Sequence, residues 1–316
     1  VFDLVKVLLT GATGFVGKRL SSHIDQQGVF ELTCAVRQPC SVECGHEILV
    51  NDLAVETDWS NVLDGKPRVV IHAAARAHIM KDEVPDPLAE YRKVNVEGTL
   101  NLARQAAKAG VTRFIYISSI KVSGEQPFSG KPFTADDVPA PEGSYGISKL
   151  EAENGMREIA SDTGMEVVII RPPLVYGPGV KGNFASMINL IEKGLPLPLG
   201  AIHNKRSLVA LDNLVDLIVT CIDHPAAANQ TFLAGDGQDI STTELLQGVG
   251  QAMGKPARLI PVPAGMLILG ASLLGKRAVA KRLLGSLQVD ISKNRDMLGW
   301  QPPVSVEEGM ARAVKY

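Results

Sequence analysis

The sequence is poor in cysteine and in aromatic residues, and neither sign of charge dominates it. Among 316 residues there are four cysteines and 5% aromatic residues, and the formal net charge is -2. So few cysteines in a chain this long form no disulfide framework, which predicts a reducing, cytoplasmic location. A near-neutral charge gives no basic surface for nucleic acid, so we expect a small-molecule partner.

Metal ligands and membrane segments are also scarce. Cys40, Cys44 and His46 lie close together, but no second cluster exists to complete a four-coordinate site, so we predict no metal. The beginning of the sequence shows no signal-peptide pattern. The longest apolar run, AGMLILGASLL at 264–274, is about half the roughly 20 residues that a membrane span needs. We interpret it as a buried amphipathic helix, ahead of attachment to a membrane surface.

A glycine-rich turn stands where a strand meets a helix. The apolar run VKVLLT at 5–10 predicts a buried strand, and a helix is expected to continue to about residue 27. A glycine recurs at every third position between this strand and this helix. The three glycines let the backbone approach a pyrophosphate at the positive end of the helix. The residues predicted to bind a dinucleotide here are Gly11, Thr13, Gly14, Phe15, Val16 and Gly17.

The next strand ends extend this predicted cofactor site. The strand at 32–36 ends in Arg37, where NAD sites usually carry an acidic residue against the ribose 2′-hydroxyl. A basic residue suits the 2′-phosphate of NADP, although a plain surface arginine fits equally well. Asp52 and Leu53 follow a strand at 48–50, and the Asp52 carboxylate could accept from the adenine amino group. A strand over 68–75 then closes on small residues that let a cofactor pass, namely Ala73, Ala74 and Ala75. His72 before them is expected to be a packed histidine.

A tyrosine and a lysine at helical spacing predict acid–base chemistry. Tyr145 and Lys149 would lie on one face of a helix, where the ammonium lowers the phenol pKa from its usual value of about 10. Ser118 and Ser119 follow a strand at 113–117, from which a hydroxyl could hold a substrate oxygen. A helix over 88–109 turns Asn95 inward, as a structural bridge or a brace of the active site. This set suits proton transfer at an alcohol or sugar oxygen beside a hydride transfer.

The alternation of strands and helices, closed by a strand at 166–170, predicts a doubly wound parallel sheet, the Rossmann α/β fold, over residues 1–172. From 173 to 316 prolines and glycines break the chain into shorter elements. We expect a second, smaller substrate-binding α/β domain there, with part of 205–235 returning to the first domain. Its expected elements are 184–193, 207–209, 211–222, 231–233 and 242–253.

Taken together, nine motifs resemble the extended short-chain dehydrogenase/reductases that act on nucleotide sugars. They are TGATGFVG, the Asp52-Leu53 pair, HAAA, VNVEGT, the Ser118-Ser119 pair, YGISK, RPPLVYGPG, the segment 206–212 and DISKNRDMLGW. Within the family the chain looks most like UDP-hexose 4-epimerases and 4-keto-sugar reductases. The resemblance implies that Ser119 and Tyr145 are catalytic hydroxyls, that Lys149 binds the nicotinamide ribose, and that Asn95 braces the site. It also implies that Asn183 and Arg206 contact the nucleotide diphosphate, with Ser118 and Arg282 as further substrate-binding candidates.

The sequence differs from the family's pattern at two places, and these differences together with Arg37 limit the reactions that we expect. Dehydratases of the family carry an acidic pair where this chain has Ile120 and Lys121, which argues against dehydration, and many members have tyrosine where Ser123 stands. Because Arg37 suits NADP, the sequence favours NADPH-dependent reduction of a UDP-4-keto-6-deoxy-hexosamine in bacterial surface-polysaccharide synthesis. The alternatives are a UDP-hexose 4-epimerase that retains NAD and, more distantly, a cofactor-binding regulator without catalysis. A homodimer is compatible with any of them.

Overall fold

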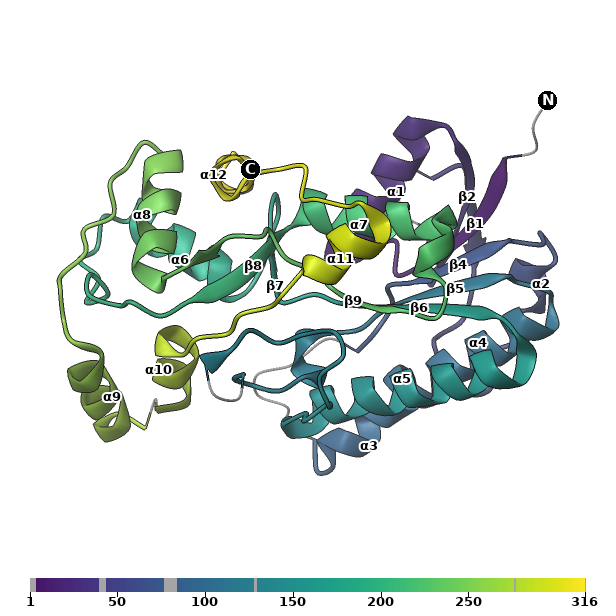
Figure 1. Cartoon of the computed structure of the whole chain (residues 1–316), viewed down its shortest axis with the longest axis horizontal. Coiled ribbons are helices and arrows are strands. Elements are labelled where there is room, and N and C mark those ends of the chain that lie inside the picture. The colour runs from purple at the N-terminus through teal and green to yellow at the C-terminus, as the bar shows by residue number, and fades with distance from the viewer. Residues whose placement is uncertain (1–3, 40–43, 77–83, 128–129, 276, 316) are drawn as a thin grey trace.

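The computed structural model describes residues 4–39, 44–76, 84–127, 130–275 and 277–315. Its larger sheet has seven parallel strands in the order β3-β2-β1-β4-β5-β6-β9 (Figure 1). The strands are β1 Val5–Thr10, β2 Phe30–Val36, β3 His46–Leu49, β4 Val69–His72, β5 Arg113–Ile117, β6 Glu166–Arg171 and β9 Thr231–Leu233. The predicted doubly wound parallel sheet is confirmed.

Helices cover both faces of this sheet. On one face, side chains such as Val7 and Leu9 share a core with α1 (Phe15–Gln27) and α7 (Leu211–Asp223). On the other face, Leu8 and Val70 share a core with helices α4 (Thr99–Lys108) and α5 (Gly143–Thr163). Figure 1 shows α1 and α7 above the sheet and α4 and α5 below it. Burial on both faces explains why the strands appear in the sequence as continuous apolar runs.

The helix predicted over 88–109 contains a break in its hydrogen-bond pattern. It consists of α3 (Pro87–Arg92), a π-helical segment η1 (Lys93–Gly98) and α4. A Cβ on Gly98 would lie 2.6 Å from the carbonyl oxygen of Leu53, so η1 passes close to the segment that follows β3. π-Helical turns occur often at functional sites, and Asn95 lies within this one.

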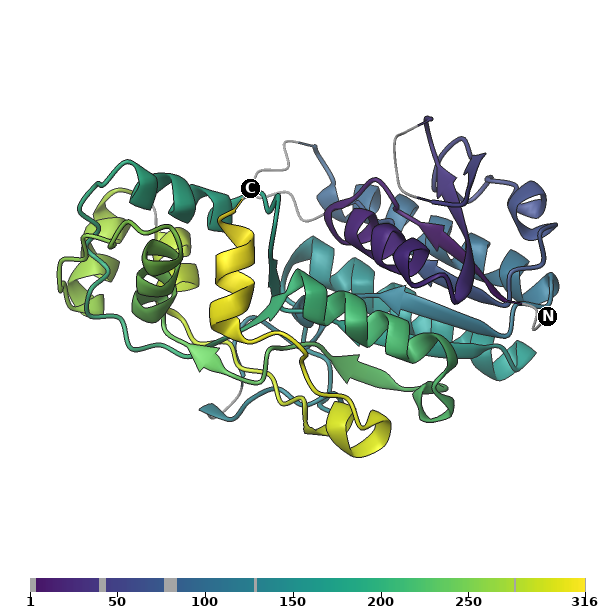
Figure 2. The ribbon, with the colours of Figure 1, turned by 90° about the horizontal axis from the view of Figure 1, so that it is seen from above.

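A second unit is built around a small sheet with the order β10-β8-β7, whose strands are β7 Leu174–Tyr176, β8 Arg206–Ala210 and β10 Asp239–Ile240. β7 and β10 were not predicted. Helices α6 (Asn183–Glu192), α8 (Thr242–Ala252) and α12 (Val306–Ala313) share a core with this sheet. β8 stays in the small sheet, whereas the following α7 and β9 join the larger one. The boundary near residue 172 stays a prediction. Figure 2 shows the two units side by side.

The remaining short elements connect these units. They are α2 Ser60–Leu63, η2 Ile120–Val122, η4 Pro225–Ala227, α9 Ala264–Leu273, α10 Arg277–Leu284 and α11 Ser292–Leu298. The prediction that 264–274 is buried is wrong: it forms α9, none of whose residues is buried. No helix in the described part of the chain is both long and apolar enough to cross a membrane.

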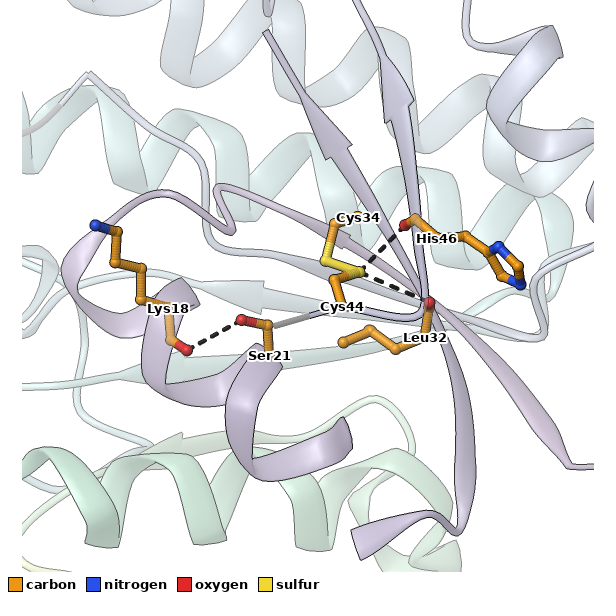
Figure 3. Close-up of a disulfide and its surroundings, with 6 residues drawn as sticks. All are labelled: Lys18, Ser21, Leu32, Cys34, Cys44 and His46. Carbon is orange, nitrogen blue, oxygen red and sulfur yellow. Dashed lines mark hydrogen bonds between the residues drawn. A yellow bond between two sulfur atoms is a disulfide. The ribbon is translucent and has the colours of Figure 1, made fainter. Parts of the chain in front are cut away.

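One disulfide links neighbouring strands at the edge of the larger sheet. Cys34 in β2 is bonded to Cys44, which lies two residues before the start of β3, with 6.5 Å between their Cα atoms (Figure 3). Cys221 in α7 is a buried free thiol, and Cys40 lies outside the described residues. A single disulfide is not a disulfide framework. Its presence nevertheless means that the low cysteine content no longer supports a reducing compartment.

Candidate active site

The glycine turn forms a tight cradle at the carboxyl end of β1. Gly11 has a φ of +77°, and a Cβ on it would lie 2.6 Å from the backbone nitrogen of Ala74. A Cβ on Gly17 would lie 2.0 Å from the Gly11 carbonyl oxygen. Only glycine therefore lets α1 and the segment after β4 close on the turn. The first N–H groups of a helix have no partner within it and carry partial positive charge, so the first turn of α1, which begins at Phe15, suits a pyrophosphate.

The adenosine end of the predicted site lies beyond β2. Arg37 follows the strand, and its guanidinium Nη1 lies 3.6 Å from Oδ1 of Asp52. Both side chains are largely exposed, at 73% and 61%. Asp52 also accepts from the backbone N–H of Leu53 at 2.8 Å, which fixes the carboxylate at this edge. The structure thus brings Arg37 and Asp52 together as a pair.

His72 ends β4 beneath the glycine turn. Its two ring nitrogens lie 2.7 Å from Thr10 Oγ1 and 3.0 Å from Thr99 Oγ1. Burial, reinforced by the charge of Lys149, lowers the pKa of His72 to about 3, which keeps the ring neutral. The prediction of a packed histidine is confirmed. Ala73 and Ala74, which follow it, line the cradle against Gly11.

The proposed acid–base tyrosine lies at the start of α5. Tyr145 is half-buried, and its ring packs edge-on against Tyr91 with 5.8 Å between ring centroids. Burial raises the pKa of Tyr145 to about 12, while a hydrogen bond with Ser119 lowers it. The expected lowering of this pKa is wrong for the protein alone, because removal of the phenol from water outweighs the stabilisation of its charged form.

Lys149 lies one helical turn further along the same side of α5. Its side chain is buried, and Nζ donates to the carbonyl oxygen of Ile117 at 2.9 Å. Nζ also lies 4.5 Å from the ring centroid of Tyr116, within the range of a cation–π contact. Burial lowers the pKa of Lys149 to about 7, and the carboxylate of Glu153 raises it. The ammonium is therefore held in place by the end of β5 and by its own helix.

Glu153 continues this side of α5 and is a site residue that the sequence analysis missed. Its carboxylate is fully buried and accepts two hydrogen bonds from Arg171, at 2.9 and 2.6 Å. Arg157 donates to it at 3.1 Å and Ser118 at 2.6 Å. Ser118 therefore points into this buried cluster, in place of the substrate contact predicted for it. The spacing of four residues from Lys149 could have identified Glu153, since both lie on one side of a helix.

Asn95 connects two segments that border the site. Its side-chain oxygen accepts from the backbone N–H of Arg76 at 2.8 Å. Its amide nitrogen donates to the Arg76 carbonyl and to Ser148 Oγ, both at 3.2 Å. Asn95 is 1% exposed, which confirms that it faces inward. Asn95 therefore connects the segment after β4 to helix α5 through its side-chain hydrogen bonds.

Gly146 fixes the distance between Ser119 and Tyr145. A Cβ on Gly146 would lie 2.8 Å from the carbonyl oxygen of Lys121. The backbone N–H of Lys121 in turn donates to Ser119 Oγ at 3.2 Å. The short helix η2 is thus pressed against the first turn of α5, which brings the two predicted catalytic hydroxyls together.

The predicted substrate contacts lie in the second unit. Arg206 begins β8, is half-buried, and donates from Nη1 to the carbonyl oxygen of Gly285 at 3.1 Å. Burial lowers its pKa, and nearby Glu125 raises it. Asn183 begins α6 and Arg282 lies in α10, but their side chains lie outside the described residues.

The parallel sheet, the glycine cradle and the Ser119, Tyr145 and Lys149 set define a dinucleotide-dependent enzyme of the extended short-chain dehydrogenase/reductase class. Residues 7–235 match the model of the NAD dependent epimerase/dehydratase family. The chain belongs to this family. Its activity is of the family's type, that of an epimerase or reductase of nucleotide sugars.

Known proteins resemble the chain over nearly its whole length. It is 50% identical over 310 residues to a UDP-glucose 4-epimerase of Vibrio cholerae, covering 98% of this chain and 94% of the relative. Among solved structures, a UDP-glucose 4-epimerase from Thermotoga maritima with UDP-glucose superposes with a TM-score of 0.77 at 22% identity, covering 98% of each chain. A UDP-glucuronic acid 4-epimerase from Bacillus cereus in complex with NAD gives the same TM-score, identity and coverage.

Proposed function

We propose that the protein is a UDP-sugar 4-epimerase that retains NAD. The observation that carries this proposal is the 50% identity, over 98% of the chain, to a UDP-glucose 4-epimerase. The site supplies what the reaction needs from the protein: a hydroxyl pair at Ser119 and Tyr145, a buried cation at Lys149 and a glycine cradle. This reverses the preference for a reductase that the sequence alone favoured.

Tyr145 and Ser119 have different roles in the proposed epimerisation. When bound, oxidised nicotinamide supplies a hydride acceptor at C4 of the sugar and a positive charge that favours the Tyr145 phenolate. With the cofactor bound, the Tyr145 phenolate would accept the proton of O4, and Ser119 would hold that oxygen in place. The 4-keto sugar would have to turn its other face to the site before Tyr145 returned the proton to O4. The hydride would go back to C4 in the same step, so no cofactor would be consumed.

The pairing of Arg37 with Asp52 favours NAD over NADP. A free guanidinium would offset the charge of a 2′-phosphate, but here a carboxylate 3.6 Å away already lies beside it. The same carboxylate is available to accept from a ribose hydroxyl or from the adenine amino group. Arg37 is therefore paired with a carboxylate where the sequence had favoured a partner for the 2′-phosphate of NADPH. The cytoplasmic location and the homodimer stay predictions.

Reduction of a UDP-4-keto-6-deoxy-hexosamine is the second candidate, and it would use the same tyrosine as a proton donor. Burial raises the pKa of Tyr145 to about 12, which holds the phenol protonated in the protein alone. A protonated phenol is the form that a ketoreductase uses, because it donates to the keto oxygen as hydride arrives at the carbon.

Two assays separate the candidates. Purified protein is incubated with UDP-glucose or UDP-N-acetylglucosamine and no added cofactor, and the products are resolved by chromatography. Separately it receives UDP-4-keto-6-deoxy-N-acetylglucosamine with NADH or NADPH. The epimerase predicts the galacto epimer in the first assay. Stoichiometric oxidation of a reduced cofactor in the second, with no epimer in the first, would replace it by the reductase. Tyr145→Phe serves as the inactive control in both.

A further inference from the structure

The chain contains a long basic segment in the second unit. Between Glu244 and Asp290 there is no acidic residue, although the chain as a whole has a net charge of -2. The six cations of this segment are Lys255, Arg258, Lys276, Arg277, Lys281 and Arg282. Such a local excess of one charge in a balanced protein indicates a surface that meets an anionic partner.

The same segment contains the most exposed apolar helix of the described structure. Met266 and Leu269 in α9 are 64% and 65% exposed, and Leu273 and Leu274 are 82% and 74% exposed. Their spacing of three and four residues places Met266, Leu269 and Leu273 along one side of the helix. Single exposed leucines are ordinary on a protein surface, but a contiguous row of this kind marks a contact with another body.

Basic residues adjoin this apolar row. α10 packs against α9, and both lie at the end of the molecule away from β2 and α1 (Figure 1). Arg277 and Lys281 in α10 are exposed and four residues apart, so they share a side of that helix. Ala280, between them in sequence, is 7% exposed and lies on the inner side of α10. Two helices that contact each other therefore expose an apolar row on α9 and basic side chains on α10.

We propose that α9 and α10 bind the surface of a membrane that contains anionic phospholipid. α9 has ten residues, too few to span a bilayer, but enough to lie in the interface with its leucines among the acyl chains. The α10 cations would then meet the lipid phosphates, whose charge they complement. The occupant is an anionic lipid surface because a second copy of this segment would oppose basic residues to basic residues. This proposal goes beyond the proposed reaction and does not depend on it.

Membrane binding through α9 and α10 would place the predicted substrate-binding residue Arg206 near the bilayer. The residue that ends the α10 region, Gly285, accepts a hydrogen bond from Arg206, and Leu287 forms a bridge with the same residue. Arg206 is the predicted diphosphate contact. The α9–α10 surface and that contact are therefore joined directly by backbone, with no intervening element.

Sedimentation with lipid vesicles tests the proposal on the full chain. Vesicles of phosphatidylcholine alone are compared with vesicles that also contain phosphatidylglycerol, at low and high salt. We expect the wild type to sediment with the anionic vesicles and to release as salt rises. Leu269→Glu combined with Leu273→Glu should weaken this partition by about tenfold or more, and Arg277→Gln with Lys281→Gln by a similar factor.

A matched control separates a local effect from a general change in charge. Val29→Glu combined with Val138→Glu adds the same two charges at exposed sites, 54% and 86% exposed, and should leave the partition unchanged. All variants should retain wild-type turnover in solution, which shows that they fold. Wild-type protein that stays in the supernatant with anionic vesicles would overturn the proposal. So would a wild type that sediments as a dimer in solution while Leu269→Glu with Leu273→Glu is a monomer, because a second copy would then cover α9.

Discussion

Replacing Lys149 by methionine should stabilise the protein while abolishing its activity. Burial lowers the pKa of Lys149 from 10.5 to about 7. Below about pH 7 the ammonium is charged in both the folded and the unfolded state, and each unit of pKa difference is worth about 1.4 kcal/mol, so its burial costs up to about 5 kcal/mol. Methionine has a similar length and no charge. It leaves the carbonyl of Ile117 without its donor, a loss of about 1–3 kcal/mol, so the net gain should be ~2 kcal/mol at acidic pH.

The pH dependence of this gain follows from the sign of the shift. Between pH 7 and 10.5 the unfolded chain binds the Lys149 proton and the folded protein does not, so wild-type stability rises with pH across this window. The difference in stability between Lys149→Met and wild type should therefore change by about 3 kcal/mol from about pH 6 to about pH 9.5. The variant is expected to be more stable than wild type at pH 6 and about 1 kcal/mol less stable at pH 9.5. Glu153 is not left unpaired in the variant, because Arg171 and Arg157 still donate to it.

Urea unfolding at the two pH values measures the effect. The protein must be stripped of nucleotide first, because a cofactor bound only by the wild type would add stability of its own. Lys108→Met, at an exposed position in the last turn of α4, is the control and should change stability by less than about 0.5 kcal/mol. A difference between Lys149→Met and wild type that does not vary with pH would refute the reasoning, as would a variant less stable than wild type at pH 6.

Three further changes probe the site. Tyr145→Phe should lower kcat by ~10²–10⁴-fold with nucleotide binding intact by fluorescence titration, and near-normal turnover would exclude the phenol as proton carrier. Gly11→Ala should abolish NAD binding, since its Cβ would lie 2.6 Å from the Ala74 nitrogen at a φ of +77°, and unchanged NAD affinity would contradict the cradle. Arg206→Ala should raise KM for a UDP-sugar far more than it lowers kcat, and equal affinity of wild type and variant for free UDP in calorimetry would remove its diphosphate role.

The sheet and the placement of Tyr145 and Lys149 on one helix were predictable from sequence because each depends on local pattern. Residues 7–10 of β1 are buried on both faces and form a mainly apolar run, and Tyr145 and Lys149 are one helical turn apart. The position of Asn95 on the inner side of its helix followed from periodicity as well. The π-helical turn around Asn95 was not predicted, because the spacing of apolar residues does not reveal the one extra residue that such a turn contains.

Other features depend on contacts between distant segments. Ser118 was expected to face the substrate, but Glu153 accepts its hydrogen bond, and that carboxylate is drawn inward by Arg171 from β6. Arg171 lies 18 residues beyond Glu153, on a strand, and helical periodicity does not predict a contact between a helix and a later strand. α9 was expected to be buried because it is apolar, and composition alone does not reveal that the described part of the chain buries none of its residues.

The placement of β9 at the edge of the larger sheet has a consequence for synthesis of the chain. β6 ends at Arg171, but its outer neighbour β9 begins only at Thr231, after β7, α6, β8 and α7 have been made. Until then β6 is an edge strand with unpaired N–H and C=O groups, the kind of edge on which chains aggregate. A ribosome that pauses between these strands would leave that edge open. We therefore expect chains ending before residue 231 to be insoluble, even though they contain Ser119, Tyr145 and Lys149.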